Sequence, residues 1–276
     1  MPVTSLSQPM AGRRGIDQRG GVWYTGGKGG IAVNRRYHLI DGLRGLAVVN
    51  MVLYHFLFDL YILQGFRPDW REIPAVHIWQ QGICWTFLLL SGLSWHLGRH
   101  RVKNGIILNG CGLLVTLVTR IAEPEEAIWC GVLTLLGCAL LLATALGPLL
   151  ERIPALPGAI GSFCIFLLTR TVQSGSLSLG GWVLCELPKH FYVGGLATVL
   201  GFPAPGFYSS DYFPIFPWFF LYLTGLFAGR MILSRPPAIL ERRIPGLSWV
   251  GRHSLAIYLI HQPVAMTVSM AIGLLR

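Results

Sequence analysis

Seven apolar segments, each close to bilayer-spanning length and bounded by charge, Pro or Gly, recur along this chain. They cover roughly residues 43–63, 78–98, 104–121, 127–147, 157–172, 213–233 and 250–273. About 20 apolar residues in a helix are needed to cross the hydrocarbon layer of a bilayer. A mean hydropathy of +0.56 with only 12% charged residues agrees with repeated crossing. The sequence therefore predicts an all-α, polytopic membrane helix bundle with about seven transmembrane helices, with eight or nine as the alternative.

Basic residues are unevenly placed between these segments, and their placement indicates how the chain crosses the bilayer. They cluster before the first segment, after the second and after the sixth, at Arg13, Arg14, Arg19, Lys28, Arg35, Arg36, Arg99, Arg101, Lys103, Arg230, Arg235, Arg242 and Arg243. Glutamates lie between the third and fourth segments, at Glu123, Glu125 and Glu126. Because cytoplasmic loops carry the excess of Lys and Arg, we expect a cytoplasmic N-terminus and outer loops at 64–77, 119–127 and 172–212. The net charge of +10 thus indicates orientation, and no nucleic-acid partner is expected.

The outer loop at 172–212 is long enough to hold helices of its own. Because both of its ends face outside, it must contain an even number of crossings or none. Pro188, Pro203, Pro205 and paired glycines argue against two full spans. We expect short interfacial or re-entrant helices in this loop.

The chain divides into an N-terminal arm and a membrane domain. Residues 1–34 are Gly-rich, basic and without apolar periodicity, which predicts a disordered basic cytoplasmic arm before a domain at 35–276. The arm lacks the apolar core of a cleavable signal peptide, so we expect the first span to remain as an anchor. The six cysteines lack metal-ligand spacing, so neither a metal site nor a disulfide framework is expected.

The first segment, HLIDGLRGLAVVNMVLYHFLFDL (residues 38–60), carries four ionisable side chains. At about 100° per residue Asp41 and Asp59 superpose, and Arg44 and His55 fall within roughly 60° of them. A charge at the bilayer centre costs about 2.5 kcal/mol or more, so this alignment predicts a polar face turned into the bundle. Arg44 would lie near the cytoplasmic edge and His55 about 16 Å deeper. A helix cap at Asp41, a lipid-phosphate anchor at Arg44 and a simple interhelical bond at His55 remain alternatives.

A second polar cluster, GRHSLAIYLIHQPV, lies in the last segment. Ser254, Tyr258 and His261 fall on one helix face within about 60° of one another. Pro263 can loosen the turn around His261 and Gln262. We expect Tyr258, His261 and Gln262 to line a polar pocket, with interhelical hydrogen bonding as the alternative for Ser254 and Tyr258.

A third cluster, DYFPIFPWFF, opens the sixth segment from its expected outer side. Pro214 and Pro217 suit the first turn of a helix, and Asp211 suits its N-cap. Asp211 would face the same outer side as His55. Asp211 and Trp218 are therefore candidate substrate-binding residues, with an aromatic-belt anchor as the alternative for Trp218.

These clusters carry a resemblance to the heparan-α-glucosaminide N-acetyltransferase-like catalytic domain family, part of a transmembrane acyltransferase superfamily. The similar stretches are IDGLRGLAVVNMVLYHFLFDL, DYFPIFPWFFLYLTGLFAGR and GRHSLAIYLIHQPV, within roughly residues 35–270. The first also resembles the acyltransferase-3 family, in which an Arg is followed eleven positions later by a His, as Arg44 and His55 are. Relatives commonly read GILH where this chain has Thr134 in GVLTLLG, so any role of that His is absent or moved here.

The resemblance implies a transmembrane O- or N-acetyltransferase that moves an acyl group, typically acetyl, from cytosolic acetyl-CoA to a sugar hydroxyl or amine on the outer face. In such a transfer His55 can take the acceptor's proton or carry the acyl group, and both roles stay open. Asp59, one turn further, can orient the imidazole of His55. Arg44 is placed to bind a CoA phosphate or to steady the thioester.

Two other classes of function fit the same residues. A non-enzymatic membrane carrier could use the Asp/Arg/His face as a pathway for protons or a solute, although this does not explain the acyltransferase spacing. An inactive relative could serve as an assembly partner, and Thr134 keeps this class open. The expected partners are membrane lipid, a glycan or glycolipid acceptor and, as an open question, a second copy of the chain. The expected location is a bacterial inner (plasma) membrane.

Overall fold

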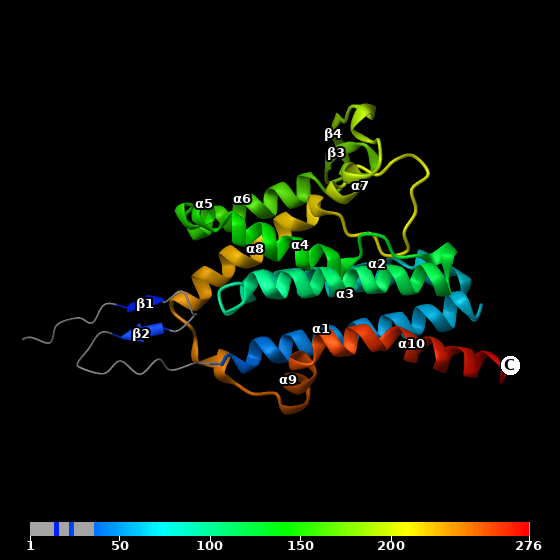
Figure 1. Ribbon diagram of the computed structural model, residues 1–276, viewed down its shortest axis with the longest axis horizontal. Helices are drawn as coiled ribbons and strands as arrows, with labels where there is room; N and C mark the ends of the chain where they lie inside the picture. Colours follow the sequence, from blue (N-terminus) through cyan, green and yellow to red (C-terminus); the bar gives the residue numbers. More distant parts are fainter. Residues whose placement is uncertain (1–13, 17–21, 25–35, 276) are drawn as a thin grey trace, which may run out of the picture.

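The computed structural model describes residues 14–16, 22–24 and 36–275 as a bundle of long helices (Figure 1). The long helices are α1 (His38–Phe58), α2 (Pro74–Ser94), α3 (Arg101–Ala122), α4 (Val132–Ala145), α6 (Ala155–Leu168), α8 (Ile215–Ser234) and α10 (Ser254–Gly273). The shorter ones are α5 (Gly147–Arg152), α7 (Leu196–Leu200) and α9 (Pro245–Arg252). All seven predicted apolar segments are therefore helical, and consecutive long helices run in opposite directions along the bundle (Figure 1).

Five helices in the described residues are long and apolar enough to cross a membrane. They are His38–Leu63, Arg101–Ala122, Ala155–Ser174, Ile215–Ser234 and Ser254–Gly273. The helix α4 is apolar but has only 14 residues, while α2 is long enough but carries His77, Gln80 and Gln81 in its first half. A helical membrane bundle is confirmed, whereas the number of seven to nine spans and the cytoplasmic N-terminus stay predictions.

Glycines let the helices approach one another at their crossings. A Cβ atom at Gly45 of α1 would lie 1.9 Å from the Leu247 carbonyl oxygen of α9. A Cβ atom at Gly225 of α8 would lie 2.2 Å from the Leu89 carbonyl oxygen of α2. Small residues at such contacts are the means by which membrane helices pack closely, since lipid tails are as apolar as Leu.

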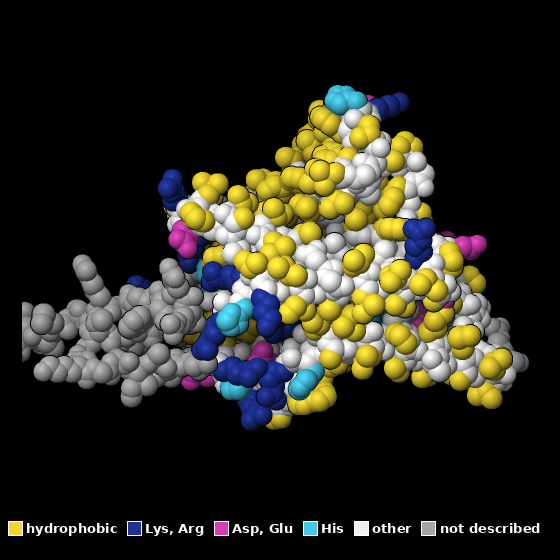
Figure 2. Space-filling model, in the orientation of Figure 1, with side chains coloured by type: hydrophobic (Ala, Val, Ile, Leu, Met, Phe, Trp, Pro, Cys, Tyr) yellow, Lys and Arg dark blue, Asp and Glu magenta, His cyan; other side chains and the backbone are white. Residues whose placement is uncertain are grey.

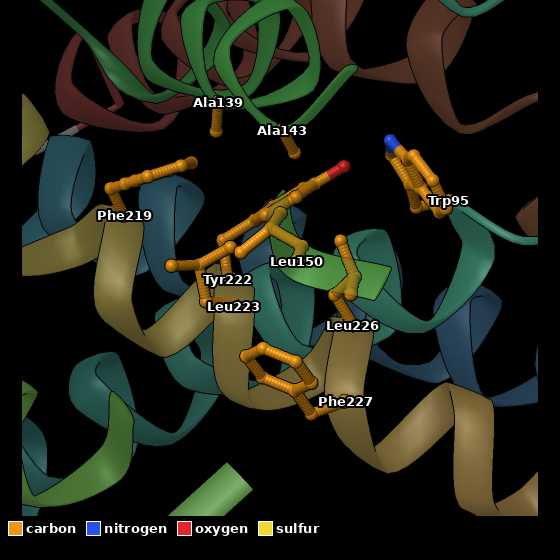
Figure 3. Close-up of a cluster of buried hydrophobic side chains, with 9 residues drawn as sticks. All are labelled: Trp95, Ala139, Ala143, Leu150, Phe219, Tyr222, Leu223, Leu226 and Phe227. Atoms are coloured by element: carbon orange, nitrogen blue, oxygen red, sulfur yellow. The ribbon is translucent and has the colours of Figure 1, made fainter. Parts of the chain in front are cut away.

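The helix α8 is the centre of the larger part of the bundle. It packs against α2, α4 and α6, and its side chains form an aromatic core with α2, α4 and α5 (Figure 3). The members of this core are Trp95, Ala139, Ala143, Leu150, Phe219, Tyr222, Leu223, Leu226 and Phe227. The small side chains of Ala139 and Ala143 leave room for the aromatic rings of α8. Small and large side chains thus fit together in this core.

The first and last helices form the second part of the bundle, at the lower edge of Figure 1. There α1 packs against α9 and α10, and contacts the larger part mainly through α2. The predicted span at 250–273 is interrupted at His253, where α9 ends and α10 begins. From there α10 runs beside α1 in the same direction, so that His261 lies beside His55 and Gly273 beside Gln64.

The segment 172–212 contains a β-hairpin that the sequence interpretation missed. Strands β3 (Ser176–Leu179) and β4 (Trp182–Glu186) pair antiparallel, followed by the short α7. The expected short helices are accompanied by this hairpin, which the sequence interpretation did not include although SLSL alternates with the two-residue period of a strand. The turn residues Gly180 and Gly181 have φ of +59° and +88°, which a tight hairpin turn requires and Gly adopts readily. The helices in the described part of this segment are all short, as expected.

The predicted disordered arm at 1–34 falls mostly outside the described residues. The described pieces are two paired three-residue strands, β1 (Arg14–Ile16) and β2 (Val22–Tyr24). Figure 2 shows Lys and Arg side chains gathered at the end of the bundle where α1 and α3 begin. We call this the basic end; the opposite end carries His55, Asp59 and the α4 N-terminus.

Candidate active site

Two histidines from opposite ends of the sequence meet between α1 and α10. The ring centroids of His55 and His261 lie 4.9 Å apart with an angle of 66° between the ring planes. The Nδ1 atom of His261 bonds the Tyr258 carbonyl oxygen at 2.5 Å. Because a carbonyl can only accept, Nδ1 carries the proton, and Nε2 of the neutral ring is left as an acceptor. Nε2 is buried and has no hydrogen-bond partner among the described residues, so it is free to accept a proton from a bound molecule.

Next to this pair, the carboxylate of Asp59 is held by Gln262. Gln262 Nε2 donates to Oδ1 at 3.0 Å and to Oδ2 at 3.2 Å, and Asp59 is fully buried. Asp59 begins a π-helical turn (η1, Asp59–Leu63) that continues α1 and alters the helical phase at this point. The predicted bond from Asp59 to His55 is not formed within the described part of the chain. The carboxylate therefore joins α1 to α10, beside the histidines.

Aromatic side chains gather around Tyr54, next to the histidine pair. The ring of Tyr54 contacts His55 at 5.8 Å, Trp70 at 5.1 Å and Trp79 at 5.5 Å between centroids. Trp70 is buried and lies on η2 (Pro68–Glu72), in the loop between α1 and α2. This loop therefore packs against Tyr54, the residue before His55 on α1.

Asp211 lies at the N-terminus of α4 rather than at the start of α8. The helix α8 begins after Pro214, whereas the carboxylate of Asp211 accepts a hydrogen bond from the backbone N–H of Val132. An anion at a helix N-terminus is favoured because that end carries a partial positive charge. Burial nevertheless raises the pKa of Asp211 to about 6, with the Val132 N–H opposing this shift.

The segment around Asp211 is joined to the loop before α4 by several hydrogen bonds. Phe213 N–H donates to the Cys130 carbonyl at 2.9 Å, and Trp129 N–H donates to Ser209 Oγ at 2.9 Å. Ser210 Oγ donates to the Glu126 carbonyl at 2.7 Å. These bonds fix the position of Asp211 relative to α4.

A small pocket lies between Asp211 and the histidine pair. Its lining comes from α3, from the residues around the start of α4, and from α10: Gly112, Val115, Ile128, Gly131, Val132, Leu133 and Tyr258. Tyr258 joins the pocket to the histidines, because it lines the pocket and its ring lies 5.3 Å from that of His261. The structure thus brings Asp211, Tyr258, His261 and His55 together around one region, whereas its location on the outer side of the membrane stays a prediction.

Arg44 lies apart from this region, toward the basic end. Its guanidinium donates to Ser94 Oγ on α2 at 2.7 Å and to Asp41 Oδ1 at 3.4 Å. Asp41 also accepts from Arg36 Nε at 3.0 Å. The predicted polar face of α1 is therefore divided: Asp41 and Arg44 form an ion-pair cluster with α2, while His55 and Asp59 face α10.

The structure also shows the surroundings of Trp218 and Thr134. Trp218 is buried in a core with Phe166 and Phe213, at centroid distances of 5.6 Å and 4.9 Å, so it is not a lipid-facing belt anchor. Its Nε1 has no partner among the described residues. Thr134 packs on Gly112, where an added Cβ would lie 2.3 Å from its Oγ1, so position 134 faces α3 beside the pocket.

Sequence reasoning missed Ser94, Tyr54 and Trp70. Ser94 is a hydroxyl at the end of an apolar segment, and that isolated polarity is the signal that could have paired it with Arg44. Tyr54 precedes His55 on α1, but its contacts with Trp70 and Trp79 depend on how the α1–α2 loop folds, which no local pattern encodes.

The span-length apolar helices indicate an integral membrane protein. Two adjacent imidazoles and a buried carboxylate form a polar site inside its bundle, between the first and the last of these helices. Comparison with known protein families identifies the family to which the chain belongs. The chain belongs to the heparan-alpha-glucosaminide N-acetyltransferase catalytic family, which matches residues 36–263. This confirms the family expected from the sequence motifs and makes the protein a member of a membrane acetyltransferase family. No curated protein and no solved structure matches the chain.

Proposed function

We propose that this protein transfers an acetyl group from cytosolic acetyl-CoA to a hydroxyl or amine of a sugar on the outer face of the membrane. The observation that carries the proposal is the contact between His55 and His261, in a chain whose family is defined by a catalytic acetyltransferase domain. A buried imidazole with a free Nε2 is the group that acyl transfer needs.

The reaction requires a proton to leave the acceptor as its oxygen or nitrogen attacks the thioester carbonyl. One imidazole takes that proton, the C–S bond breaks, and the CoA thiolate leaves and is protonated. Alternatively, one histidine first receives the acetyl group, and the acceptor then attacks the acetyl-imidazole while the other histidine takes its proton. Two imidazoles in contact serve either route, which is why we assign the transfer to the pair.

The donor is proposed to enter from the basic end. Arg44 and the neighbouring Lys and Arg side chains there favour an anionic molecule such as acetyl-CoA (Figure 2). By the positive-inside rule this end faces the cytoplasm, which places the N-terminus inside and Asp211 on the outer side. We propose seven crossings, with α2 and α4 completing the five longer apolar helices, in a bacterial inner membrane.

The test is transfer of label from radiolabelled acetyl-CoA to a product in membranes that contain the protein. Membranes with His55→Ala are expected to lose the labelled product while the variant inserts and purifies as the wild type does. Undiminished labelling by His55→Ala would refute the assignment of His55. Solute uptake by proteoliposomes in the absence of any acyl donor would instead support the carrier alternative.

A further inference from the structure

The segment between α8 and α10 is held at one surface of the membrane. It starts after Ser234, where a span-length apolar helix ends, and finishes before Ser254, where another one begins. Two successive spans joined in this way leave the bilayer on the same side, so residues 235–253 lie close to the lipid head groups. The segment contains α9, which lies beside the start of α1 at the lower edge of Figure 1.

One face of α9 packs against the first turns of α1. Ser248 is buried, and its Oγ donates to the His38 carbonyl oxygen at 3.2 Å. A Cβ atom at Gly251, three residues further along, would lie 1.8 Å from the Asp41 carbonyl oxygen, so the two backbones are in contact. Residues three apart share a helix face. The helix α9 is therefore kept at the level at which α1 enters the bilayer.

The other face of α9 is exposed and carries an aromatic ring between basic side chains. Trp249 is 53% exposed, and Arg252, three residues later, is exposed on the same face. The His253 ring lies 4.5 Å from the Trp249 ring between centroids. Arg242 and Arg243 lie just before the start of the helix and are also exposed. Trp and basic side chains are the residues with which a helix contacts the head-group region of a bilayer.

The arginines of this segment are not neutralised by acidic side chains within the described part of the chain. Residues 235–253 contain four arginines and one acidic residue. The salt bridges among the described residues lie near the starts of α1 and η2, and none of them involves Arg242, Arg243 or Arg252. Figure 2 shows Lys and Arg side chains gathered over this part of the basic end. The surface around α9 therefore attracts anions, and because it lies at the bilayer, the closest anions are lipid phosphates.

We propose that this face of α9 binds anionic phospholipid, with Trp249 in the head-group region and Arg242, Arg243 and Arg252 on the phosphate groups. A guanidinium matches a phosphate because its N–H groups form a planar fork that donates two parallel hydrogen bonds. The arginines at the two ends of α9 contact separate lipid molecules, since eight helical residues span about 12 Å. The binding is independent of the proposed acetyl transfer, because these residues lie outside the candidate active site.

The experiment measures thermal unfolding of the purified full chain in detergent as phosphatidylglycerol or phosphatidylcholine is added. A lipid that binds the folded state raises its melting temperature, so phosphatidylglycerol should act at lower concentration than phosphatidylcholine. The triple variant Arg242→Gln, Arg243→Gln and Arg252→Gln should need about a hundredfold more phosphatidylglycerol for the same rise, since each arginine near an anionic surface contributes a factor of about five. Equal responses of the wild type to the two lipids overturn the proposal.

A matched control removes the same amount of charge from other helices. Arg99→Gln, Lys103→Gln and Arg152→Gln together neutralise three exposed basic side chains outside the α9 segment. This variant is expected to respond to phosphatidylglycerol as the wild type does. Equal loss in both triple variants overturns the proposal, because it reports the net charge of the protein rather than a site on α9.

Two further measurements separate lipid binding from a damaged fold and from binding of the donor. Replacing the same three arginines of the α9 segment by Lys keeps their charge, so that variant should retain most of the response. The single variant Arg243→Gln, with an expected loss of about fivefold, decides the question if the triple Gln variant does not fold. A rise in melting temperature with CoA, lost in the Gln variant and without any rise for phosphatidylglycerol, would assign these arginines to the donor and overturn the proposal.

Discussion

His55 and His261 stand edge to face at 4.9 Å, one on the first long helix and one on the last. The helix α10 packs mainly against α1 and the π-helical turn that continues it, and this packing brings His261 to His55. The pairing of α1 with α10 therefore decides whether the site exists.

The first prediction concerns the two histidines. His261→Ala removes a buried imidazole whose Nε2 has no other partner, so acetyl transfer should fall by about 10²–10⁴-fold, the range for loss of a general acid or base. Labelled acetyl transfer in membranes measures the effect. His253→Ala is the matched control, because His253 is exposed at the α9–α10 junction and bonds only the Trp249 carbonyl. Comparable losses in both variants would contradict the role of His261.

A second prediction concerns the helix crossings. Gly45→Leu puts side-chain atoms where the Leu247 carbonyl lies, and should destabilise the bundle by about 3 kcal/mol or more. Gly110→Ala is its control within a helix, because no atom lies within 4 Å of the added Cβ, and should stabilise α3 by up to about 1 kcal/mol. Thermal unfolding in detergent distinguishes the two. A Gly45→Leu protein as stable as the wild type would show that α1 and α9 are not packed this closely.

The third prediction tests the pair formed by Asp59 and Gln262. Gln262→Leu leaves a fully buried carboxylate without its donor and should lower stability by about 1–3 kcal/mol. Asp59→Leu leaves the amide of Gln262 without its acceptor and should act similarly. The double variant removes both polar groups, so its cost should be smaller than the sum of the two single costs. Strict additivity of the three unfolding free energies would mean that the side chains do not interact.

The fourth prediction is a pH dependence from Asp211. Its pKa in the folded protein is raised from 3.8 to about 6, so the folded state binds more protons than the unfolded state between these values. The contribution of Asp211 to stability is therefore fully present below pH 3.8 and is lost as the pH rises through about 6. Asp211→Asn cannot titrate, so the difference in melting temperature between the variant and the wild type should grow over this interval. A constant difference from pH 4 to pH 7 would exclude the shift.

Much of the fold follows from apolar length and charge, but its details depend on tertiary contacts. The seven segments are all helical because a run of apolar residues in lipid must satisfy its backbone hydrogen bonds internally. The hairpin of β3 and β4 was missed because prolines and glycines indicate where a helix cannot continue. They do not indicate which secondary structure forms there instead. The break at His253 was missed for a related reason: α9 and α10 are separate helices because α9 packs across α1, where Gly251 and Asp41 meet.

The sequence indicates which residues belong to the candidate site better than it indicates which of them contact one another. Helical phase placed Asp59 on the face of His55 and placed Tyr258 with His261, and the structure brings these residues together. Phase within one helix cannot say which residue of another helix lies opposite, so Gln262 was not recognised as the partner of Asp59. Adjacent prolines suggest a cap at the start of α8 for Asp211, but its carboxylate lies beside Gly131 at the start of α4, which is distant in sequence.

The bond between Asp59 and Gln262 joins residues that are 203 positions apart. During synthesis the first helix must enter the membrane long before the last one leaves the ribosome. Throughout that interval His55 has no second imidazole, and Asp59 lacks the amide that holds it. A nascent or truncated chain therefore lacks the buried histidine pair, which is assembled only when the final helix docks.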